Sequence, residues 1–396
     1  MKVDKSKWEK KRLGEVCDVL NGLWKGKKAP FINVGVIRNT NFTKNCQLDL
    51  NDVAYLEVEQ KQFQNRKLQK GDIIIEKSGG GPKQPVGRAV LFNEEDGNYS
   101  FSNFTSTLRL KNNKVLMSFY LHKYLYYFYV KGGTVEMQNH LTGIHNLDFK
   151  QYKNISIPVP PLSEQQAIAS ELDAIQSLIT KYKEQLNDYD NLAKSIFNEM
   201  FGDVVSNDKG WERKKISDVC DTSAGGTPNK SVQSYYLNGN IPWLRSGEIT
   251  QMIISNTEIM ITKSGLDNSS AKIFPKNTIV VAMYGATAGQ VGILNFECST
   301  NQAICGILPN DNISTVFMYY VLVLMKKKLI ENASGSAQPN ISQQKIKSLS
   351  IILPPLPLQQ AFAARITAIE SQKDKVKQQI ADLQTLFDSR MQYYFD

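Results

Sequence analysis

The chain has 396 residues, of which 41% are hydrophobic and 21% are charged, and its net charge is +9. This composition is typical of a globular protein of two or three domains and excludes a predominantly disordered chain. No apolar run reaches about 18 uncharged residues, so we expect no membrane-spanning helix. The first residues lack the apolar core of a signal peptide, and the five scattered cysteines form no CxxC pair. Both observations favour a cytoplasmic protein with reduced thiols.

The charge is distributed unevenly along the chain. Residues 1–162 contain 25 Lys and Arg against 15 Asp and Glu, and residues 204–356 contain 14 against 10. Residues 163–203 contain 3 against 8, whereas residues 357–396 balance at 5 against 5. A positive surface on the two larger segments favours a polyanionic partner such as nucleic acid. Charge alone is equally consistent with a generally basic protein that binds no nucleic acid.

The first large segment combines strand and helix patterns. The β-rich run at residues 71–76 predicts a strand, and the glycine-rich residues 78–88 predict the loop that follows it. Apolar and aromatic residues at helical spacing predict a helix over residues 115–130. We interpret its aromatic residues as core side chains that pack against a sheet, rather than as a surface that stacks on bases.

A long amphipathic helix is predicted over residues 160–201. The prolines mark its start, and Ser163 is the expected N-cap residue. Apolar residues then recur at alternating spacings of three and four, a heptad seam typical of a helix that lies along another helix. The 38 residues from 163 to 200 would span about 57 Å. The seam consists of Ile168, Leu172, Ile175, Ile179, Tyr182, Leu186, Tyr189, Ala193, Ile196 and Met200.

The second half of the chain repeats the organisation of the first half. Residues 211–221 match residues 8–18 at an offset of 203, and residues 351–360 match residues 157–166 at an offset of 194. Matching segments that keep their order along the whole chain indicate a tandem duplication. Each copy is then a globular domain followed by a long helix.

The offset of 194 also carries the helix seam onto the last forty residues. Eight of the ten positions remain apolar or aromatic, which predicts a second long helix. Lys373 and Arg390 interrupt this seam, so we expect them either to extend toward solvent or to meet a partner chain, and we favour the partner chain for Lys373. The apolar or aromatic positions are Phe362, Ile366, Ile369, Val376, Ile380, Leu383, Phe387 and Tyr394.

The second large segment has the same order of elements as the first. A strand is predicted at residues 278–283, a glycine-rich loop at residues 284–292 and a helix at residues 313–331. We therefore expect each globular domain to be of the α+β class, with a twisted sheet and a few helices.

These patterns together predict an α+β protein with two tandem globular domains, each followed by a long helix. The seam of the second helix needs a partner, and the first helix of the same chain can supply it. We therefore expect an antiparallel coiled coil with pseudo-twofold symmetry, and a helix pair formed between two chains is the alternative. The predicted boundaries are residues 1–160 for the first domain, 161–203 for the central helix, 204–354 for the second domain and 355–396 for the C-terminal helix.

The order of these motifs resembles the specificity subunit of Type I restriction-modification systems, and the resemblance covers the whole chain. Each domain begins with Trp-Glu-x-x-x-Leu/Ile-x-Glu/Asp-Val, at Trp8 and at Trp211. Each ends in an Ile-x-Ile-Pro-x-Pro-Pro-Leu-like stretch before the long helix. The segments that look like target-recognition signatures of the family are residues 76–87, 225–228, 241–249 and 301–304.

The two copies depart from one another within this pattern. The second copy has Pro357 and Leu358 where the first has Ser163 and Glu164, so the two helix caps are expected to differ. The first copy lacks the Gly-Gly-Thr-Pro and Pro-Trp elements of the second. We therefore expect the two domains to recognise different DNA sequences.

The resemblance implies a non-catalytic subunit in which each globular domain is a target-recognition domain. Each domain would read one half of a bipartite, asymmetric double-stranded DNA site. The helix pair would set the spacing of the two halves and bind two methyltransferase (M) subunits. Restriction (R) subunits, which are motor-nucleases, would join the full complex. That complex would be a DNA adenine methyltransferase and endonuclease.

The residues themselves also argue against catalysis by this chain. Both Pro-Pro pairs lack the preceding Asn or Asp of an amino-methyltransferase motif, and no GxGxxG follows a predicted strand. The loop at residues 81–88 does not have the spacing of a P-loop. The histidines His122, His140 and His145 have no cluster at metal-ligand spacing, and we interpret His122 as a packed residue of the aromatic helix. We expect no cofactor and no metal.

Candidate DNA contacts are basic or amide-bearing residues in or near the glycine-rich segments. Glycine allows the backbone to approach phosphates, Arg can pair with guanine, and Asn or Gln can pair with adenine. For each of these side chains, simple exposure to solvent is the alternative interpretation. The candidates are Lys25, Lys27, Lys28, Lys77, Lys83, Gln84 and Arg88 in the first domain, and Thr227, Lys230, Arg245, Tyr284, Gln290 and Gln302 in the second.

Two other classes of function remain open at this point. A coiled-coil adapter whose basic domains bind protein or RNA would need no methyltransferase partner. An enzyme with an unrecognised site would bind a cofactor as the isolated chain. Co-purification with a methyltransferase distinguishes the specificity subunit from the adapter.

Overall fold

The computed structural model describes residues 3–81, 84–95, 97–139, 144–331 and 340–396. The chain divides into two compact units. Unit 1 comprises Met1–Tyr182 and Gln379–Asp396, and unit 2 comprises Lys183–Gln378. Each unit contains one globular domain and part of both long helices. Among the described residues, no helix is long and apolar enough to cross a membrane.

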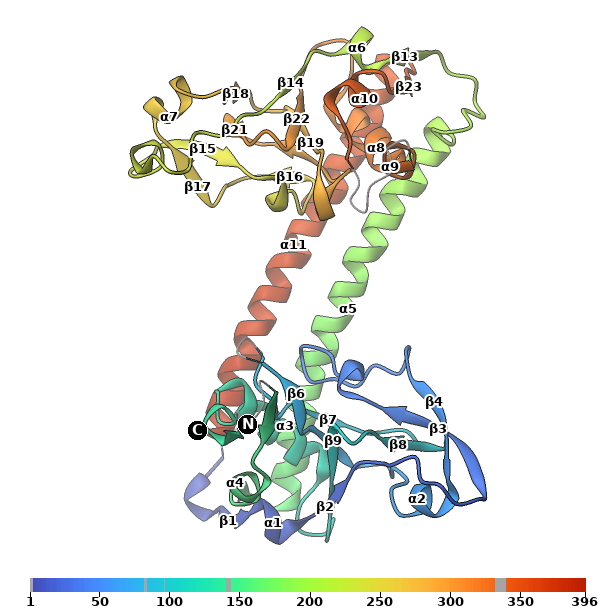
Figure 1. The fold of residues 1–396 in the computed structure, drawn as a ribbon, viewed down its shortest axis with the longest axis vertical. Coiled ribbons are helices and arrows are strands. Elements are labelled where there is room, and N and C mark those ends of the chain that lie inside the picture. Colours follow the sequence, from blue (N-terminus) through green and yellow to red (C-terminus); the bar gives the residue numbers. More distant parts are fainter. Residues whose placement is uncertain (1–2, 82–83, 96, 140–143, 332–339) are drawn as a thin grey trace. The chain divides into compact units, whose positions relative to one another are not determined.

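Over its described residues unit 1 contains four small sheets, three of which have three or four strands (Figure 1). The predicted strand at residues 71–76 is confirmed as β5, which is central in the four-stranded sheet and fully buried. The four-stranded sheet has the order β2 (Cys17–Asn21), β9 (Thr105–Leu110), β5 (Ile73–Glu76) and β7 (Ala89–Leu91). The other two have the orders β4 (Ala54–Glu59), β3 (Phe31–Ile37), β8 (Tyr99–Phe101), and β10 (Gln138–Asn139), β11 (His145–Leu147), β6 (Ser78–Gly80).

The aromatic helix of unit 1 is a core element, as predicted. It forms α3 (Ser118–Val130), three residues shorter at its start than the predicted range. Tyr120 and Tyr124 are buried, and their hydroxyls donate to the carbonyls of Pro158 and Ser156 at 3.0 and 2.7 Å. The remaining helical elements of unit 1 are η1 (Lys5–Lys7), α1 (Leu13–Val16), η2 (Asn39–Asn41), α2 (Gln60–Gln64), η3 (Val135–Met137) and α4 (Phe149–Lys153).

Unit 2 contains two larger sheets. The predicted strand at residues 278–283 is confirmed as β19, again central and buried. The first sheet has the order β14 (Thr222–Ala224), β22 (Ile304–Ile307), β19 (Ile279–Ala282), β20 (Val291–Leu294) and β16 (Ile253–Ile254). The second has the order β17 (Ile259–Ile261), β15 (Ile241–Leu244), β21 (Cys298–Thr300) and β18 (Ile273–Phe274).

The helix predicted at residues 313–331 is two helices. The first, α8 (Thr315–Leu324), ends at Met325, and α9 (Lys326–Glu331) follows at once. The break comes where the apolar run meets three lysines, of which the middle one is exposed and the other two are half-buried, while Leu329 is buried. The remaining helical elements of unit 2 are α6 (Ile216–Val219), η4 (Gln233–Tyr235), η5 (Ser246–Glu248), α7 (Lys263–Asp267), η6 (Gly285–Thr287) and α10 (Gln343–Lys347).

Both domains are closed in the same way. In unit 1, β1 (Glu9–Arg12) pairs antiparallel with β12 (Ser156–Val159). In unit 2, β13 (Arg213–Lys215) pairs antiparallel with β23 (Ser350–Ile352). The matching Trp-Glu and Pro-Pro segments therefore meet as a two-stranded ribbon directly before each long helix.

The first long helix begins earlier than the predicted N-cap at Ser163 implies. Helix α5 spans Leu162–Phe201, and the amides of Glu164 and Gln165 donate to the carbonyl of Pro161 at 2.9 and 3.0 Å. The prediction of Ser163 as N-cap is therefore wrong, because this serine already lies inside the first turn. Helix α11 spans Leu356–Phe395 and starts in the same way after its own Pro-Pro pair.

A buried glutamine ties the first turn of each long helix to its domain. Gln165 donates to the carbonyls of Val115 and Pro160 at 2.9 and 2.8 Å, and accepts from the amide of Met117 at 2.8 Å. Gln359 occupies the same position in α11, at the offset of 194. It donates to the carbonyl of Pro354 at 2.7 Å and accepts from the amide of Ser314 at 2.9 Å. The sequence analysis did not single out either glutamine.

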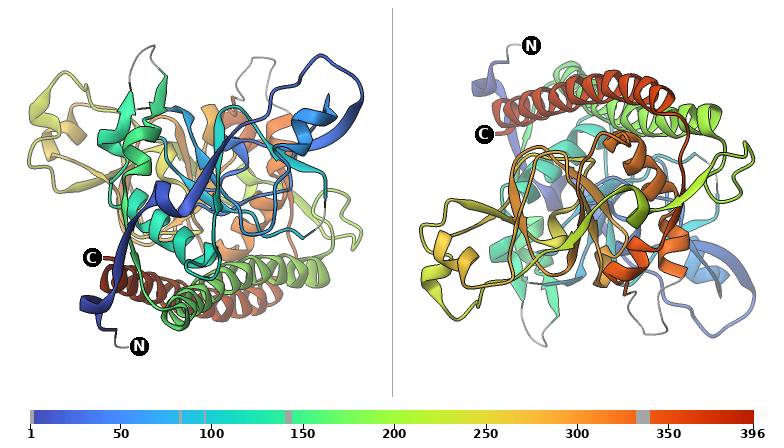
Figure 2. Two further views of the ribbon diagram at one scale, coloured as in Figure 1. Left: turned by 90° about the horizontal axis from the view of Figure 1, so that it is seen from below. Right: turned by 90° about the horizontal axis from the view of Figure 1, so that it is seen from above.

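The two helices pack against each other within each unit. In unit 1 the end of α11 lies beside the first turns of α5 (Figure 2), and in unit 2 Phe197 and Phe201 of α5 pack edge-on against Phe362 of α11. Among the expected seam residues of the two helices, Leu172, Ile175, Ile179, Ile366, Ile369 and Val376 are buried, and Leu186, Ile196, Ile380 and Leu383 are half-buried.

The charged residues of the seam are paired inside the chain. Arg390 contacts Glu171 with Nε at 2.5 Å from Oε1, and the hydroxyl of Tyr394 donates to the same carboxylate at 2.6 Å. Lys373 lies 2.7 Å from Asp190 of α5 and 2.8 Å from Glu370. The prediction that Lys373 meets a partner chain is therefore wrong, because Lys373 forms an ion pair within its own chain.

Candidate nucleic-acid interface

The hydrogen-bond register of the sheets shows which positions of the two domains correspond. The amide of Glu76 donates to the carbonyl of Arg88 at 2.8 Å, as the amide of Ala282 donates to that of Gln290 at 2.9 Å. In return, the carbonyls of Glu76 and Ala282 each accept from the amide of a glycine of positive φ, Gly87 and Gly289. Arg88 and Gln290 therefore hold one and the same position, directly after the glycine-rich loop.

Arg88 lies inside unit 1, although it was predicted to contact DNA. It is 8% exposed, and its Nε and Nη2 donate to the carboxylate of Glu76 at 2.7 and 2.9 Å. Nη1 donates to the carbonyl of Phe42 at 2.9 Å. Burial alone would lower the pKa of Arg88, but the hydrogen bonds and charge of Glu76 raise it. Because its donors are occupied, we leave Arg88 out of the proposed interface.

Three predicted lysines of unit 1 are exposed on the loop between β2 and β3. The carboxylate of Glu59 accepts from the backbone amides of Lys27 and Lys28, both at 3.3 Å, and the amide of Glu59 donates to the carbonyl of Lys25 at 2.9 Å. The backbone of the loop is thus fixed while its ammonium groups face solvent. Such groups suit contacts with phosphates.

The other candidates of unit 1 lie near the second glycine-rich segment. Lys77 follows β5 and is half-buried, and this burial lowers its pKa. Gln84 is exposed, and Lys83 lies outside the described residues.

In unit 2 the Gly-Gly-Thr-Pro loop brings two candidates together. The hydroxyl of Thr227 donates to the side-chain oxygen of Gln302. A Cβ atom at Gly225 would lie 2.3 Å from the carbonyl oxygen of Asn301, and one at Gly226 would lie 2.2 Å from the backbone of Ser270. Only glycine allows this close approach, so the motif fixes the loop against β21.

Lys230 and Arg245 line a single hollow in unit 2 with a volume of about 680 Å³. Its apolar wall includes Trp243, whose indole N–H donates to the carbonyl of Gly226 at 2.9 Å. Tyr236, also in the wall, donates to the carbonyl of Pro228 at 2.6 Å. The hollow is therefore attached to the loop that carries Thr227, and it combines two cations with an aromatic wall.

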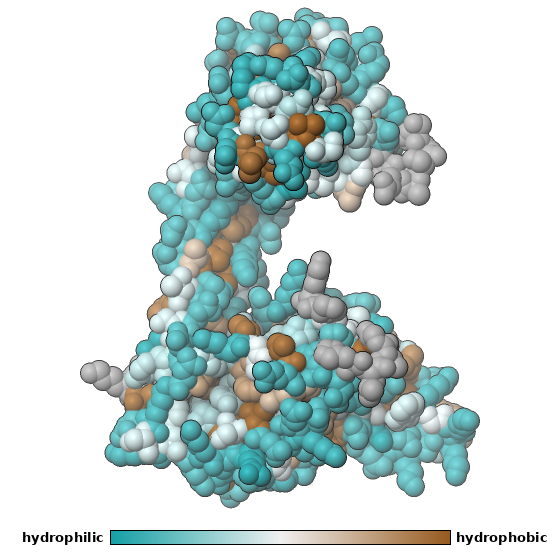
Figure 3. Space-filling model, turned by 60° about the vertical axis from the view of Figure 1, so that its left-hand side comes forward, coloured by the Kyte–Doolittle hydropathy of each residue, from teal (hydrophilic) through white to brown (hydrophobic). Residues whose placement is uncertain are grey.

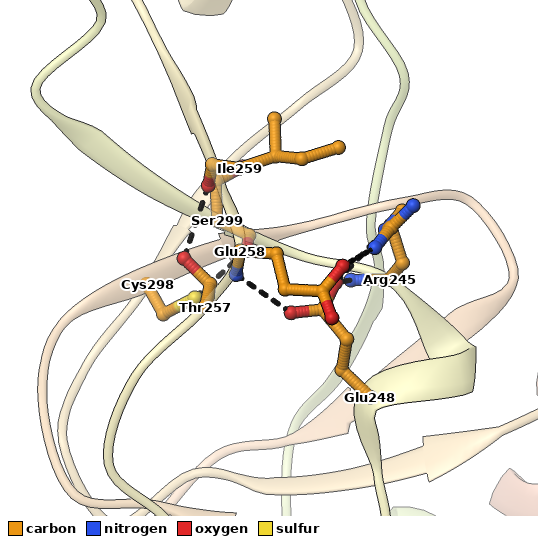
Figure 4. A network of polar contacts seen from close by, with 7 residues as sticks. All are labelled: Arg245, Glu248, Thr257, Glu258, Ile259, Cys298 and Ser299. Carbon is orange, nitrogen blue, oxygen red and sulfur yellow. Dashed lines mark hydrogen bonds and ion pairs between the residues drawn. The ribbon is translucent and has the colours of Figure 1, made fainter. Parts of the chain in front are cut away.

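Arg245 is held by carboxylates but remains accessible (Figure 4). Its Nε donates to Glu248 at 2.9 Å, and it also pairs with Glu258, whose amide donates to Glu248 at 2.9 Å. The hydrogen bond that Arg245 donates to Glu248 is the main cause of its raised pKa. The side chain is 41% exposed, so its carboxylate contacts are weak surface pairs that a nucleic acid could replace.

Tyr284 and Gln290 lie at the two ends of the loop between β19 and β20, and both are exposed. Neither is among the residues that line the hollow. The structure thus groups Thr227 with Gln302 and Lys230 with Arg245, while Tyr284 and Gln290 belong to a separate loop.

Arg38 is a residue that the sequence analysis missed. It precedes η2 directly after β3, as Arg245 precedes η5 directly after β15. Its amide donates to the side chain of Asn41 at 2.9 Å, and the amide of Arg245 donates to Glu248 at 3.2 Å. The signal was present as Val-Ile-Arg-Asn-Thr-Asn against Trp-Leu-Arg-Ser-Gly-Glu at an offset of 207.

The residues with possible chemical reactivity are internal. All five cysteines are buried, and burial raises the pKa of each thiol, to about 11 for Cys46. The His122 ring nitrogen Nε2 lies 3.2 Å from the carbonyl of Ala89, in keeping with a packed residue. His145 lies in β11 with Nδ1 at 2.9 Å from the side-chain oxygen of Gln138, and His140 is outside the described residues. Over the described ranges, no three His, Cys, Asp or Glu side chains could hold a metal ion.

Comparison with known proteins gives the family. The family model for the Type I restriction modification DNA specificity domain matches residues 5–188 and again residues 208–385. The chain is 24% identical to the putative type I restriction enzyme MjaX specificity subunit of Methanocaldococcus jannaschii, over 94% of this chain and 90% of that protein. It is also 24% identical to the EcoR124I/EcoR124II specificity subunit of Escherichia coli, over 62% of each chain.

Solved structures show the same fold. The S subunit of a Type I restriction-modification system from M. genitalium superposes with a TM-score of 0.57 and 14% identity, over 99% of this chain and 97% of that one. A chain from a study of complex assembly in a type I R-M system superposes with a TM-score of 0.59 and 19% identity, over 98% and 97%. With two specificity domains that together cover most of its length, the chain belongs to the family of Type I restriction-modification specificity subunits.

Proposed function

We propose that this subunit catalyses no reaction itself and that each of its two DNA-recognition domains reads one half of a bipartite, asymmetric duplex site. The observation that carries the proposal is the shared scaffold with unlike side chains. Gln290 of unit 2 is exposed at the backbone position where unit 1 buries Arg88, so at this position only unit 2 presents a contact group. Two readers that share a backbone but differ in their contact groups suit two different half-sites.

The proposed DNA contacts are basic and polar side chains in or near the loops described above. Lysines on the fixed β2–β3 loop supply phosphate contacts, while arginine and glutamine side chains can distinguish guanine and adenine. Arg38 joins the set because it matches Arg245. The set comprises Lys25, Lys27, Lys28, Arg38, Lys77, Lys83 and Gln84 in the first domain and Thr227, Lys230, Arg245, Tyr284, Gln290 and Gln302 in the second.

We further propose that the helix pair sets the spacing of the half-sites and binds two methyltransferase subunits, with restriction subunits joining them. Apolar side chains reach the surface of the helices (Figure 3), and among them Leu178, Leu192 and Leu386 are exposed. Residues 163–203 carry a net charge of −5, which disfavours contact with DNA and leaves this surface to protein partners. The chain needs no cofactor of its own in this role and acts in the cytoplasm, where the DNA is.

The experiment is to co-express the chain with its methyltransferase and to map methylated adenines in genomic DNA by single-molecule sequencing. A split, asymmetric motif is expected. Arg245→Ala should relax one half of the motif only, whereas Arg365→Ala, at an exposed position of α11, should leave the recognised sequence unchanged. One continuous motif, or equal loss in both halves with Arg245→Ala, contradicts the split reader.

The adapter alternative makes a different prediction in the same preparation. An adapter would purify without a methyltransferase and would bind duplex DNA without sequence preference. The two specificity domains found by the family model favour the specificity subunit over the adapter.

A further inference from the structure

We propose that two positions, occupied by Trp24 and Asn103 in unit 1 and by Thr227 and Gln302 in unit 2, form the same base-reading pair in both domains. This inference rests on the proposed function and deepens it. Neither Trp24 nor Asn103 was among the candidates drawn from the sequence, which favoured lysines on that loop.

The correspondence between Trp24 and Thr227 follows from backbone hydrogen bonds. The amide of Leu23 donates to the carbonyl of Phe101 at 2.8 Å, and the amide of Gly226 donates to that of Thr300 at 2.9 Å. Phe101 and Thr300 are the last residues of β8 and β21, which pair in parallel with β3 and β15. The residue that follows each donor is Trp24 in unit 1 and Thr227 in unit 2.

A steric match at the preceding glycine supports the same alignment. A Cβ atom at Gly22 would lie 1.9 Å from the carbonyl oxygen of Ser102, and one at Gly225 would lie 2.3 Å from that of Asn301. In both domains the backbone of the loop therefore lies directly against the backbone that follows the strand end, and only a residue without a Cβ atom fits there. The residues that follow Ser102 and Asn301 are Asn103 and Gln302, which completes the pair.

In unit 2 the pair is already assembled for reading a base edge. The hydroxyl of Thr227 donates to the side-chain oxygen of Gln302 and so orients the exposed amide. An amide oxygen has a second lone pair, so the group can still present one acceptor and its donors. That combination suits adenine in the major groove.

In unit 1 the same position displays an indole. Trp24 is 63% exposed, between anchor points on both sides: the Leu23 amide bond to β8 and the Lys25 carbonyl bond to the amide of Glu59 at 2.9 Å. The backbone turns at Gly26 with φ of 72°. The loop is thus fixed before any partner binds, which reduces the entropy lost on binding.

A single exposed aromatic residue is common on protein surfaces and by itself signals nothing. What distinguishes Trp24 is its place in the scaffold and its neighbours, since Lys25, Lys27 and Lys28 on the same loop bring phosphates close to it. An apolar side chain at a base edge selects the C5-methyl group of thymine. The pair thus reads a thymine in one half-site and an adenine in the other.

The test is carried out on the full chain co-expressed with its methyltransferase. The double variant Trp24→Thr with Asn103→Gln installs the unit 2 pair in unit 1. We expect the methylated motif to change at one or two adjacent positions, only in the half that Arg245→Ala leaves intact. Affinity for the original site should fall about tenfold or more, since a good base contact discriminates by about 1–3 kcal/mol. An unchanged motif overturns the inference.

Two controls keep the outcomes distinct. Tyr55→Ala removes another aromatic side chain of unit 1 with similar exposure, 60%, from strand β4 and should leave the motif unchanged. If the double variant yields no folded complex, Asn103→Ala alone is measured for binding to the original site and to a site changed at each position, and an unaltered ratio at all positions overturns the pair. A wild-type complex without a split motif would instead refute the proposed function.

Discussion

The two domains use one backbone position in opposite ways. In unit 1 the position after the glycine-rich loop holds Arg88, buried against Glu76, and in unit 2 it holds Gln290, exposed opposite Ala282. An arginine near a glycine-rich loop suggests a DNA contact from sequence, yet here the neighbouring glutamate turns it inward. Whether a side chain at a repeated position can contact DNA thus depends on its burial and on its neighbouring side chains, and not on its residue type alone.

The largest effect is expected from breaking the internal ion pair of unit 1. Glu76→Ala leaves the Arg88 guanidinium buried without its counter-charge, and such a change typically costs about 3–5 kcal/mol. Hydrogen exchange of the full chain should show lower protection in β5 and β9, while β19 and β22 of unit 2 keep theirs.

The matched control is Glu95→Ala, which removes an exposed carboxylate that pairs with Lys70 and should leave stability nearly unchanged. The double variant Glu76→Leu with Arg88→Met should regain much of the lost protection, because it leaves no buried charge. Loss of DNA affinity in Arg88→Met without any loss of stability would contradict the internal role of Arg88.

The next largest effects are expected from replacing the buried glutamine at the start of each long helix. Gln165→Leu leaves two carbonyls and one amide without partners, and should lower the stability of unit 1 by about 3 kcal/mol. Gln359→Leu removes one hydrogen bond fewer and should cost unit 2 about 2 kcal/mol. Hydrogen exchange in α3 and α8 measures both effects, and Gln166→Leu, at an exposed neighbour, is the control. Equal protection in all three variants would show that the glutamines do not fasten the helices.

We expect acid to lower the stability of unit 1 more than that of unit 2, because of a single histidine. Burial, and then the charge of Lys123, lowers the pKa of His122 from 6.5 to about 4, while Asp173 opposes the shift. The folded state therefore binds this proton less readily than the unfolded state, and stability falls as pH drops from 6.5 toward 4. By pH 5 unit 1 should have lost about 2 kcal/mol.

In unit 2, Tyr319 occupies the position that His122 has in unit 1. Each of the two residues lies five positions after the amide that donates to the buried glutamine of its unit. Unit 2 has no histidine at this position and therefore does not lose stability in this way. Thermal unfolding and hydrogen exchange at pH 7 and pH 5 measure the difference. His122→Phe should make unit 1 as insensitive as unit 2 over this range. A loss of equal size in that variant would assign the acid sensitivity to other groups.

The smallest effect is expected at the seam ion pairs. Glu171→Gln weakens the contact with Arg390 in unit 1, and Asp190→Asn weakens the contact with Lys373 in unit 2. These pairs are partly exposed, so each change should cost about 0.5–1 kcal/mol and less at high salt. Thermal unfolding in low and high salt tests this, and a loss that does not depend on salt would indicate packing rather than charge.

Much of the fold could be predicted because its signals are local. The offsets of 203 and 194 revealed the duplication, and the runs at 71–76 and 278–283 are central strands. Helical periodicity predicted both long helices, because a heptad repeat is easily recognised when it continues over forty residues. The start of α5 was misplaced because a serine near a helix start signals a cap wherever in the first turn it lies.

The candidate site was harder to predict because it depends on contacts between distant residues. The burial of Arg88 is set by Glu76 and by the carbonyl of Phe42, 46 positions away. The equivalence of Trp24 and Thr227 follows from backbone hydrogen bonds to the ends of two strands. The residue types do not reveal it, because an indole and a hydroxyl have no chemical group in common. Periodicity reports which face of an element is buried, but not which loop residue lies beside which.

The seam ion pairs also bear on what half of this chain could do alone. A fragment ending after α5 could pair only with another copy of itself. The offset of 194 puts Ile196 in the place of Arg390 and Ile179 in the place of Lys373. Glu171 and Asp190 would then each face an isoleucine instead of a cation. The charges thus distinguish the chain's own second helix from a second copy of the first, and we expect a half-length copy to be a poor competitor for assembly.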